Sequence, residues 1–304
     1  MDLLQLLRQD DDISGGGKFI LVLQFVMSSP VLTSTNNPTI KHLLRLRNNR
    51  VRRREARMLV DGWREIRRAL EAGLTPAGIY CVPTESSTGS PEEQSIAGCE
   101  NWVRQRAPRS IRGVSTHVMA KIGYGNSSRG AVAEFESVTR PIADLPVPTS
   151  SLVIVLDHFE KPGNIGAVFR SADAAGVGAI LLCPEETDAF NPNVIRSSLG
   201  AVFSVPFATA SETSAREWLS SNGFQIAAMR VESSQPIWRQ DLVQPTAVVI
   251  GNEANGLGNR WQSDESDDVQ SLSIPMHGCV DSLNASVTAA VVLFEARRQR
   301  TILT

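Results

Sequence analysis

Six short apolar runs, separated by stretches of helical pattern, place the tightest limits on how the second half of this chain can fold. Each run is continuously apolar rather than alternating, which is typical of strands buried on both faces of a sheet. Strands that alternate with helices favour a mostly parallel sheet with helices on both faces, an α/β fold. We therefore predict strands at 152–156, 179–183, 202–205, 225–229, 247–250 and 272–274.

Candidate site residues follow the first of these strands. Ligands of parallel sheets bind where strands reach their carboxyl ends. Here the turn Pro162-Gly163 leads to Asn164 at the start of a helix, and Arg170 comes six residues later. Six helical residues turn the chain by about 240° and advance it by about 9 Å. Only Asn164 should therefore face a ligand, while Arg170 must reach back or serve an adjacent subunit.

A second polar loop follows the strand at 247–250. Gly251 and Gly256 permit a close backbone approach to a ligand, and Glu253 can order the loop or accept hydrogen bonds. No G-x-G-x-x-G pattern follows any predicted strand, so a dinucleotide-binding cradle is not expected. Taken alone, the loop reads equally well as a plain strand-to-helix turn.

A third loop leads into the final helix. Pro275 stops the preceding strand, because it lacks the N–H that a ladder requires. Either Ser282 or Asn284 can cap the helix that follows. The apolar positions Val287, Val291 and Phe294 recur in that helix at helical spacing.

The first half of the chain has a different character. We expect an N-terminal extension at 1–32, compatible with disorder and without a catalytic role. A small α/β domain at 33–140 and a proline-containing linker at 141–150 should follow. The second domain then spans 151–304. The net charge of −2 hides a densely basic segment, which favours RNA contact since arginine binds phosphate and stacks on bases. The candidate RNA-binding residues there are Lys41, Arg45, Arg47, Arg50, Arg52, Arg53 and Arg54.

Cysteine usage and hydropathy exclude several other classes. Cys81, Cys99, Cys183 and Cys279 are scattered without a CxxC pair, so we expect neither a metal site nor a disulfide framework. This fits a cytoplasmic protein. The apolar run at 18–27 is too short to span a membrane, and the acidic residues before it argue against a signal peptide. Met27 is an alternative start.

Taken together, the three loops resemble the SpoU (TrmH-type) family of the SPOUT superfamily, S-adenosylmethionine-dependent RNA 2′-O-ribose methyltransferases. The resemblance covers about 151–300 and rests on Asn164-Ile165-Gly166 with Arg170, Gly251-Asn252-Glu253 with Gly256-Leu257, and Ile274-Pro275-Met276 with Ser282-Leu283-Asn284. The first half resembles the ribosomal-protein-like RNA-binding domain of many members, whose end would lie at Arg129–Ala133.

This resemblance implies a trefoil-knotted C-terminal domain, a homodimer and an active site near the subunit interface. It implies cofactor-binding roles for Gly251, Ile274, Met276 and Leu283, and catalytic roles for Asn164, Arg170, Glu253, Ser282 and Asn284. Arg129 would join the RNA-binding residues. Members with an extra domain often modify ribosomal RNA, so 23S ribosomal RNA is favoured over transfer RNA as the substrate.

Arg170 has been viewed as the base in this family, but a guanidinium is effectively always protonated. Binding the phosphate beside the target ribose is an easier role for it. His158 and His277 flank the loops but match no catalytic position of the family. Three alternatives stay open: a transfer RNA 2′-O-methyltransferase, a non-catalytic RNA-binding or ribosome-assembly factor, and a nucleotide-dependent oxidoreductase. The last is disfavoured since the glycine-rich phosphate turn is absent.

Overall fold

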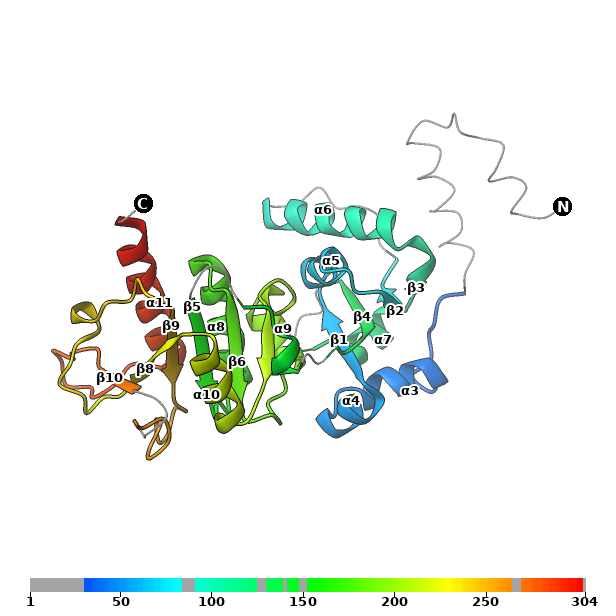
Figure 1. Ribbon diagram of the computed structural model, residues 1–304. Coiled ribbons are helices and arrows are strands. Elements are labelled where there is room, and N and C mark those ends of the chain that lie inside the picture. Colours follow the sequence, from blue (N-terminus) through cyan, green and yellow to red (C-terminus); the bar gives the residue numbers. More distant parts are fainter. Residues whose placement is uncertain are drawn as a thin grey trace. The chain divides into compact units, whose positions relative to one another are not determined.

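The computed structural model describes residues 30–83, 91–124, 130–138, 141–147, 152–263 and 269–302, and the chain divides into two compact units (Figure 1). The first contains the described residues up to Arg52 together with Leu59–Glu136. The second contains Arg53–Met58 and the described residues from Ser137 onward. Most of the predicted extension at 1–32 and part of the linker at 141–150 lie outside the described residues.

A four-stranded sheet of order β1-β4-β2-β3 forms the centre of the first unit. Strand β2 pairs antiparallel with β4 and parallel with β3. Its core joins Ile40 and Leu43 of one helix, Val118 and Ile122 of another, and Val132 of β4. The elements are β1 (Arg57–Asp61), β2 (Pro76–Cys81), β3 (Ile111–Gly113), β4 (Ala131–Glu136), α3 (Pro38–Arg45), α4 (Asn49–Glu55), α5 (Trp63–Glu71), α6 (Pro91–Arg106) and α7 (Thr116–Ile122).

A six-stranded sheet of order β10-β8-β9-β5-β6-β7 forms the centre of the second unit. Every neighbouring pair in it is parallel, which confirms the predicted α/β class with a parallel sheet. β5, β6 and β9 are buried along their whole length, as continuous apolar runs require. The strands are β5 (Leu152–Asp157), β6 (Ala179–Cys183), β7 (Phe207–Thr209), β8 (Gln225–Met229), β9 (Thr246–Ile250) and β10 (Val269–Leu272).

Two predicted strands are displaced. The run at 202–205 is wrong as a strand: Gly200 takes a left-handed conformation, the short 3-10 helix Ala201–Phe203 follows, and β7 begins only after Pro206. Ala201 and Val202 are nevertheless buried, and periodicity alone does not separate a buried turn from a short strand. The last strand ends at Leu272 rather than Ile274, since the next residue makes only an isolated bridge.

Helices cover both faces of this sheet. Ala215 and Leu219 of α10 pack with Val153, Val155 and Val249, which point to one face. On the other side, α8 contacts α9 and α11, and α11 contacts β9. The helices are α8 (Pro162–Ala175), α9 (Pro192–Ser197), α10 (Glu212–Ser221) and α11 (Ala285–Ile302). Within the described ranges, none of the helices is long and apolar enough to cross a membrane.

Gly166 permits a close contact between two helices. A Cβ atom at this position would lie 1.9 Å from Ser197 Oγ and 2.5 Å from the Val194 carbonyl oxygen, both in α9. α8 can therefore lie directly against α9 only while residue 166 has no side chain.

Candidate active site

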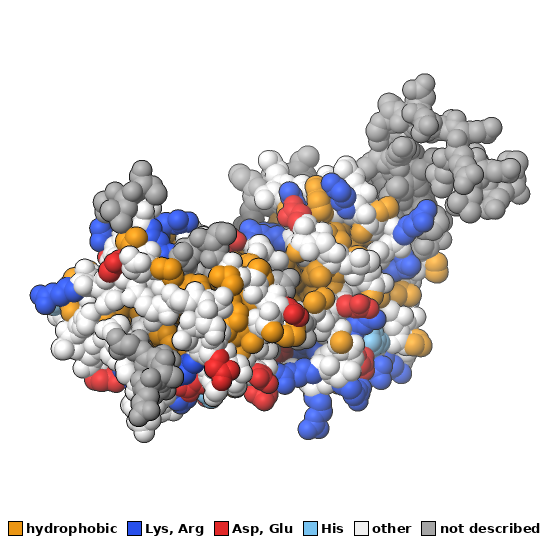
Figure 2. Space-filling model, in the orientation of Figure 1, with side chains coloured by type: hydrophobic (Ala, Val, Ile, Leu, Met, Phe, Trp, Pro, Cys, Tyr) orange, Lys and Arg blue, Asp and Glu red, His pale blue; other side chains and the backbone are white. Residues whose placement is uncertain are grey.

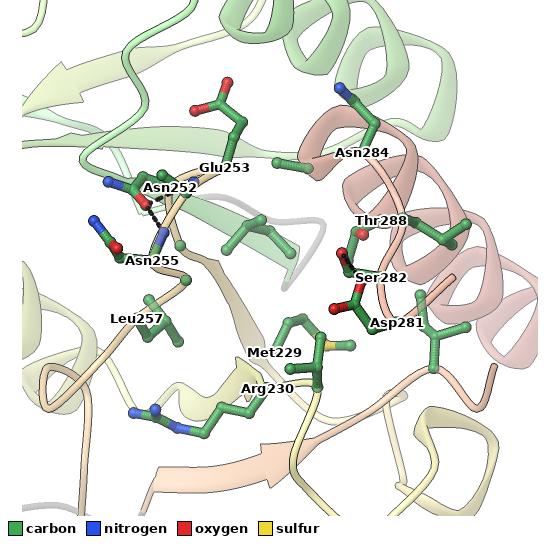
Figure 3. A pocket seen from close by; sticks show the side chains of 18 of the residues that line it. Met229, Arg230, Asn252, Glu253, Asn255, Leu257, Asp281, Ser282, Asn284 and Thr288 are labelled. Carbon is green, nitrogen blue, oxygen red and sulfur yellow. Dashed lines mark hydrogen bonds between the residues drawn. The ribbon is translucent and has the colours of Figure 1, made fainter. Parts of the chain in front are cut away.

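The three candidate loops meet around one cavity of about 630 Å³ at the carboxyl ends of β8 and β9 (Figure 3). Figure 3 shows the loop with Asn252, Asn255 and Leu257 on one side and Asp281, Ser282 and Thr288 on the other. All four predicted cofactor-binding residues line the cavity, namely Gly251, Ile274, Met276 and Leu283. Three predicted catalytic residues line it too: Glu253, Ser282 and Asn284.

The loop at 251–258 closes tightly on itself. A Cβ atom on Gly251 would lie 2.2 Å from the carbonyl carbon of Gly256, so only glycine fits there. The Gly256 amide donates to the carbonyl oxygen of Asn252 (3.1 Å), and Gly256 has a φ of +58°. Asn252 Oδ1 accepts the amides of Ala254 and Asn255 (Figure 3). The shape of the loop itself therefore requires these glycines, whether or not a ligand is bound.

Asn164 joins the first loop to the other two. Its Nδ2 donates to Glu253 Oε1 at 2.5 Å, and its Oδ1 accepts from Asn284 Nδ2 at 3.4 Å. The three side chains come from positions 89 and 120 residues apart in the sequence. Asn164 itself is not one of the cavity's lining residues, but it ties two of them together at the rim.

Asn284 is the cap of α11. Its Oδ1 accepts the backbone amide and the hydroxyl of Ser286, at 2.9 and 2.7 Å. Ser282 Oγ instead donates to Asp281 Oδ1 at 3.3 Å. The choice that the sequence left open between Ser282 and Asn284 is thus settled by the structure. Asn284 both starts the helix and bonds to Asn164.

Arg170 lies on the exposed side of α8 and is not among the described residues that line the cavity. The same helix contacts α11, where Ala289, Val292 and Ala296 are buried. The apolar positions singled out in the sequence are a different set and form an exposed stripe: Val287 is 47% exposed, Val291 39% and Phe294 50%. The helical spacing is as predicted, but these three do not pack on the sheet.

The basic segment of α3 and α4 splits into two groups. Lys41, Arg45, Arg47, Arg50, Arg53 and Arg54 are exposed. Figure 2 shows Lys and Arg side chains gathered over these helices, at the lower right. Arg52 is only 3% exposed, and its guanidinium donates to the carbonyl oxygens of Leu46 and Arg47, just beyond α3. It supports the fold, so we no longer count it as an RNA contact. Arg129 lies outside the described residues.

Cys183, His158 and His277 do not supply a reactive group to the cavity. Burial raises the pKa of the Cys183 thiol to about 12, and the nearby Asp157 carboxylate adds to the shift. His158 Nδ1 lies 2.8 Å from Asp157 Oδ1, and His277 is exposed; neither histidine lines the cavity. Across the described part of the chain, no group of three His, Cys, Asp or Glu side chains is arranged to hold a metal ion.

Several residues that shape the site escaped the sequence reasoning. Four of them line the cavity: Lys161, Arg230, Asp281 and Thr288. A fifth, Arg260, donates a hydrogen bond to the Gly256 carbonyl of the lining loop. None of them lies in a recognisable pattern. Their only signal in the sequence is that they lie near strand ends or the glycine-containing loop. Position in the sequence does not show where a long side chain points.

Comparison with known proteins agrees with this geometry. Residues 151–294 match the model of the SpoU rRNA methylase family, and residues 37–133 match that of the MRM3-like substrate-binding domain. A 23S rRNA (uridine(2479)-2′-O)-methyltransferase of Streptomyces viridochromogenes is 30% identical over 84% of this chain and 87% of its own length. A 23S rRNA (guanosine-2′-O-)-methyltransferase of Xylella fastidiosa is 34% identical over 64% of this chain and 79% of its own.

A solved structure extends the likeness to the fold. The SpoU methyltransferase AviRb from Streptomyces viridochromogenes, in complex with the cofactor AdoMet, superposes with a TM-score of 0.74. It is 28% identical and covers 88% of this chain and 99% of its own. The chain belongs to the SpoU rRNA methylase family. The resemblance carried by the three loops is thereby confirmed, and with it a fold of SPOUT type and dependence on S-adenosylmethionine.

Proposed function

We propose that this protein transfers a methyl group from S-adenosylmethionine to a ribose 2′-hydroxyl of 23S ribosomal RNA. The observation that carries the proposal is the hydrogen-bonded set Asn164, Glu253 and Asn284 at the rim of the cavity. Relatives named as 23S rRNA 2′-O-methyltransferases supply the substrate class. Transfer RNA is the second candidate substrate, because a relative from Synechocystis sp. is named as a tRNA/rRNA methyltransferase.

The cavity fits the chemistry of the cofactor. S-adenosylmethionine has an adenine and a sulfonium but no phosphate, so an apolar wall and backbone groups suit it better than a phosphate cradle. Ile250, Ile274, Met276 and Leu283 supply the apolar wall, and Gly251 and Leu257 supply backbone groups. Besides Glu253, the carboxylates of Glu232 and Asp281 line the cavity and suit a cationic ligand. When bound, the cofactor supplies an electrophilic methyl group.

The rim residues would hold the ribose. Glu253 is fixed by the amide of Asn164, while Asn284 is fixed by Asn164 and by its role as helix cap. Ser282 lies beside them with a hydroxyl that can donate or accept. In our proposal these four groups orient the 2′-hydroxyl for attack in line with the methyl group, which converts binding energy into correct geometry.

We assign Arg170 to phosphate binding in a homodimer. It is exposed on α8, beside α11 with its apolar stripe Val287, Val291 and Phe294. An exposed apolar stripe of this kind is typical of a protein–protein contact. A second copy packed there would bring one subunit's Arg170 towards the other subunit's cavity. The guanidinium would then bind the phosphate next to the target ribose.

The remaining parts of the proposal concern organisation. The domain at 33–140 would bind RNA through the exposed arginines of α3 and α4. Arg129, just before the last strand of that domain in the sequence, would join them. Residues 141–150 would connect this domain to the catalytic domain at 151–304. Residues 1–32 would take no part in catalysis. Within the catalytic domain, the segment leading into α11 would thread as a trefoil knot. We place the protein in the cytoplasm, where ribosomal RNA is modified.

The proposal is tested by incubating the protein with labelled S-adenosylmethionine and total RNA from a strain that lacks its gene. We expect label at one 2′-O-methylated position of 23S ribosomal RNA. Label in transfer RNA alone would keep the chemistry and overturn the substrate. Absence of label, together with absence of cofactor binding by calorimetry, would favour the non-catalytic RNA-binding alternative.

A further inference from the structure

A buried carboxylate is linked through Arg260 to the loop that lines the cavity. Asp157 is the last residue of β5, is 0% exposed and is not a lining residue. Its Oδ2 accepts from Arg260 Nε at 2.6 Å, and its Oδ1 lies 2.8 Å from His158 Nδ1. A buried charge is costly unless it is paired and hydrogen-bonded. Arg260 supplies that pairing for Asp157.

Arg260 connects that carboxylate to the loop that lines the cavity. While Nε binds Asp157, an NH2 group of the same guanidinium donates to the carbonyl oxygen of Gly256 at 3.2 Å. This carbonyl belongs to the peptide against which Gly251 packs, with a Cβ on Gly251 only 2.4 Å from it. Asp157 and Arg260 thus fix the point at which the loop closes.

A second guanidinium fixes the same segment from the cavity side. Arg230 lines the cavity (Figure 3). Its side chain is only 8% exposed. It donates to the carbonyl oxygens of Gly258 (2.8 Å), Arg260 and Trp261 (3.2 Å). The carbonyl of Arg260 is therefore bound by Arg230, while its side chain is bound by Asp157.

Two glycines make this loop costly to order, even with the hydrogen bonds that Asn252 makes inside it. Gly256 and Gly258 both have positive φ values, +58° and +55°, and glycine has the largest backbone freedom to lose on ordering. Binding a ligand to a loop that is not already ordered costs affinity, because the ordering is then part of binding. Fixed carbonyls on 256–261 remove that cost before the cofactor arrives.

From these contacts we infer that Asp157 and Arg260 are positioning residues for the cofactor: they hold the loop 251–258 in its binding shape without touching the ligand. This inference rests on the proposed function, since it takes the ligand of the cavity to be S-adenosylmethionine. It distinguishes them from the rim residues Asn164, Glu253 and Asn284, which we place beside the ribose.

The test compares Arg260→Gln with Arg239→Gln, an equal loss of charge at an exposed arginine of the same unit. Calorimetry measures the Kd for S-adenosylmethionine, and hydrogen exchange measures protection of amides 252–258. We expect Arg260→Gln to weaken cofactor binding by about tenfold or more, which is what loss of a hydrogen bond to a charged group produces. It should also raise exchange in the loop, with the KM for RNA unchanged. Arg239→Gln should behave as wild type.

Asp157→Asn completes the test. If the two residues act as one unit, the double variant Asp157→Asn/Arg260→Gln should bind no more weakly than the worse single variant, since coupled residues are not additive. If Asp157→Asn does not fold, the Arg260 comparison still decides. An unchanged Kd and unchanged loop exchange in Arg260→Gln would overturn the inference while leaving the function intact. Failure of the wild type to bind S-adenosylmethionine would instead overturn the proposed function, and loop exchange would still report on Arg260.

Discussion

Asn164 is the residue on which the separate loops converge, and its amide is suited to the position because it both donates and accepts. Glu253 needs a donor and Asn284 offers one, so Asn164 must present Nδ2 to the first and Oδ1 to the second. Neither a carboxylate nor a hydrocarbon side chain can do both. The asparagine is therefore demanded by two partners that are remote in sequence.

We predict that Asn164→Ala lowers kcat by about a hundredfold, as loss of an orienting polar group at an active site does. Asn164→Asp should be worse at neutral pH, because it places a second carboxylate beside Glu253. Its activity should recover partly as the pH is lowered, since a protonated carboxyl can donate as the amide does. A pH series of single-turnover rates for both variants checks this, and equal pH profiles would contradict it.

The cysteines make a second prediction at this scale. Cys279 is exposed, whereas Cys183 is buried and burial raises the pKa of its thiol to about 12. The thiolate is the reactive form, and only a raised pH near that value would generate it at Cys183. At pH 8, iodoacetamide should therefore modify Cys279 in the native protein and leave Cys183 unmodified, as peptide mass spectrometry would show. Modification of both at similar rates would contradict the buried environment of Cys183.

At the level of elements, continuous apolar runs predict strands well where the run is both buried and extended. The prediction fails where a buried turn produces the same apolar run. β5, β6, β8 and β9 lie within a residue of their expected positions. The run at 202–205 is buried but turns, because Gly200 and Pro206 interrupt the extended backbone. The stripe on α11 shows the converse: Val287 and Phe294 have helical spacing but are exposed, whereas the small residues Ala289 and Ala296 are buried.

The site could be predicted by its loops but not by its side-chain partners. Asn164, Glu253 and Asn284 each follow a strand of the parallel sheet, at its carboxyl edge, so their meeting follows from the fold. Nothing in the sequence indicates that Arg52 turns inward while its neighbours stay exposed. The same holds for the bond from Arg260 to Asp157. Such contacts depend on tertiary packing, which local pattern does not encode.

The loop at 251–258 gives a prediction for Gly251. Gly251→Ala would place a methyl group 2.2 Å from the Gly256 carbonyl carbon, so the loop must open. We expect binding of S-adenosylmethionine to weaken by more than about tenfold, in line with the cost of overpacking. Gly163→Ala is the matched control, because a Cβ there meets nothing within 4 Å. Calorimetry on both variants decides, and near-wild-type affinity of Gly251→Ala would contradict the loop geometry.

The helices α3 and α4 give a prediction for RNA binding. Arg45→Gln/Arg50→Gln removes two exposed charges and should weaken RNA binding, with the slope of log K against log salt reduced by about two. Arg52→Gln should instead lower the melting temperature, because it removes buried bonds to the Leu46 and Arg47 carbonyls. Filter binding over a salt series, with thermal melts, separates the two. An unchanged salt slope in the double variant would argue against this surface.

For the whole molecule, the central expectation is that the working form is a dimer built on α11. A charge in an apolar contact is costly, so Phe294→Glu should give a monomer in sedimentation and reduce methyl transfer by more than about tenfold. Val147→Glu is the control, since Val147 is an exposed apolar residue that is not part of the stripe. A Phe294→Glu protein that stays dimeric, or is monomeric and fully active, would contradict the assignment of Arg170 to the partner's site.

The claim that the reaction occurs on a ribose hydroxyl can be measured directly. The wild type and Asn164→Ala would each be incubated with S-adenosylmethionine and 23S ribosomal RNA from the deletion strain, and the RNA digested to nucleosides for mass spectrometry. We predict one 2′-O-methylated nucleoside with the wild type, close to one methyl per RNA, and little with Asn164→Ala. A base-methylated nucleoside, or equal products from both proteins, would contradict the account.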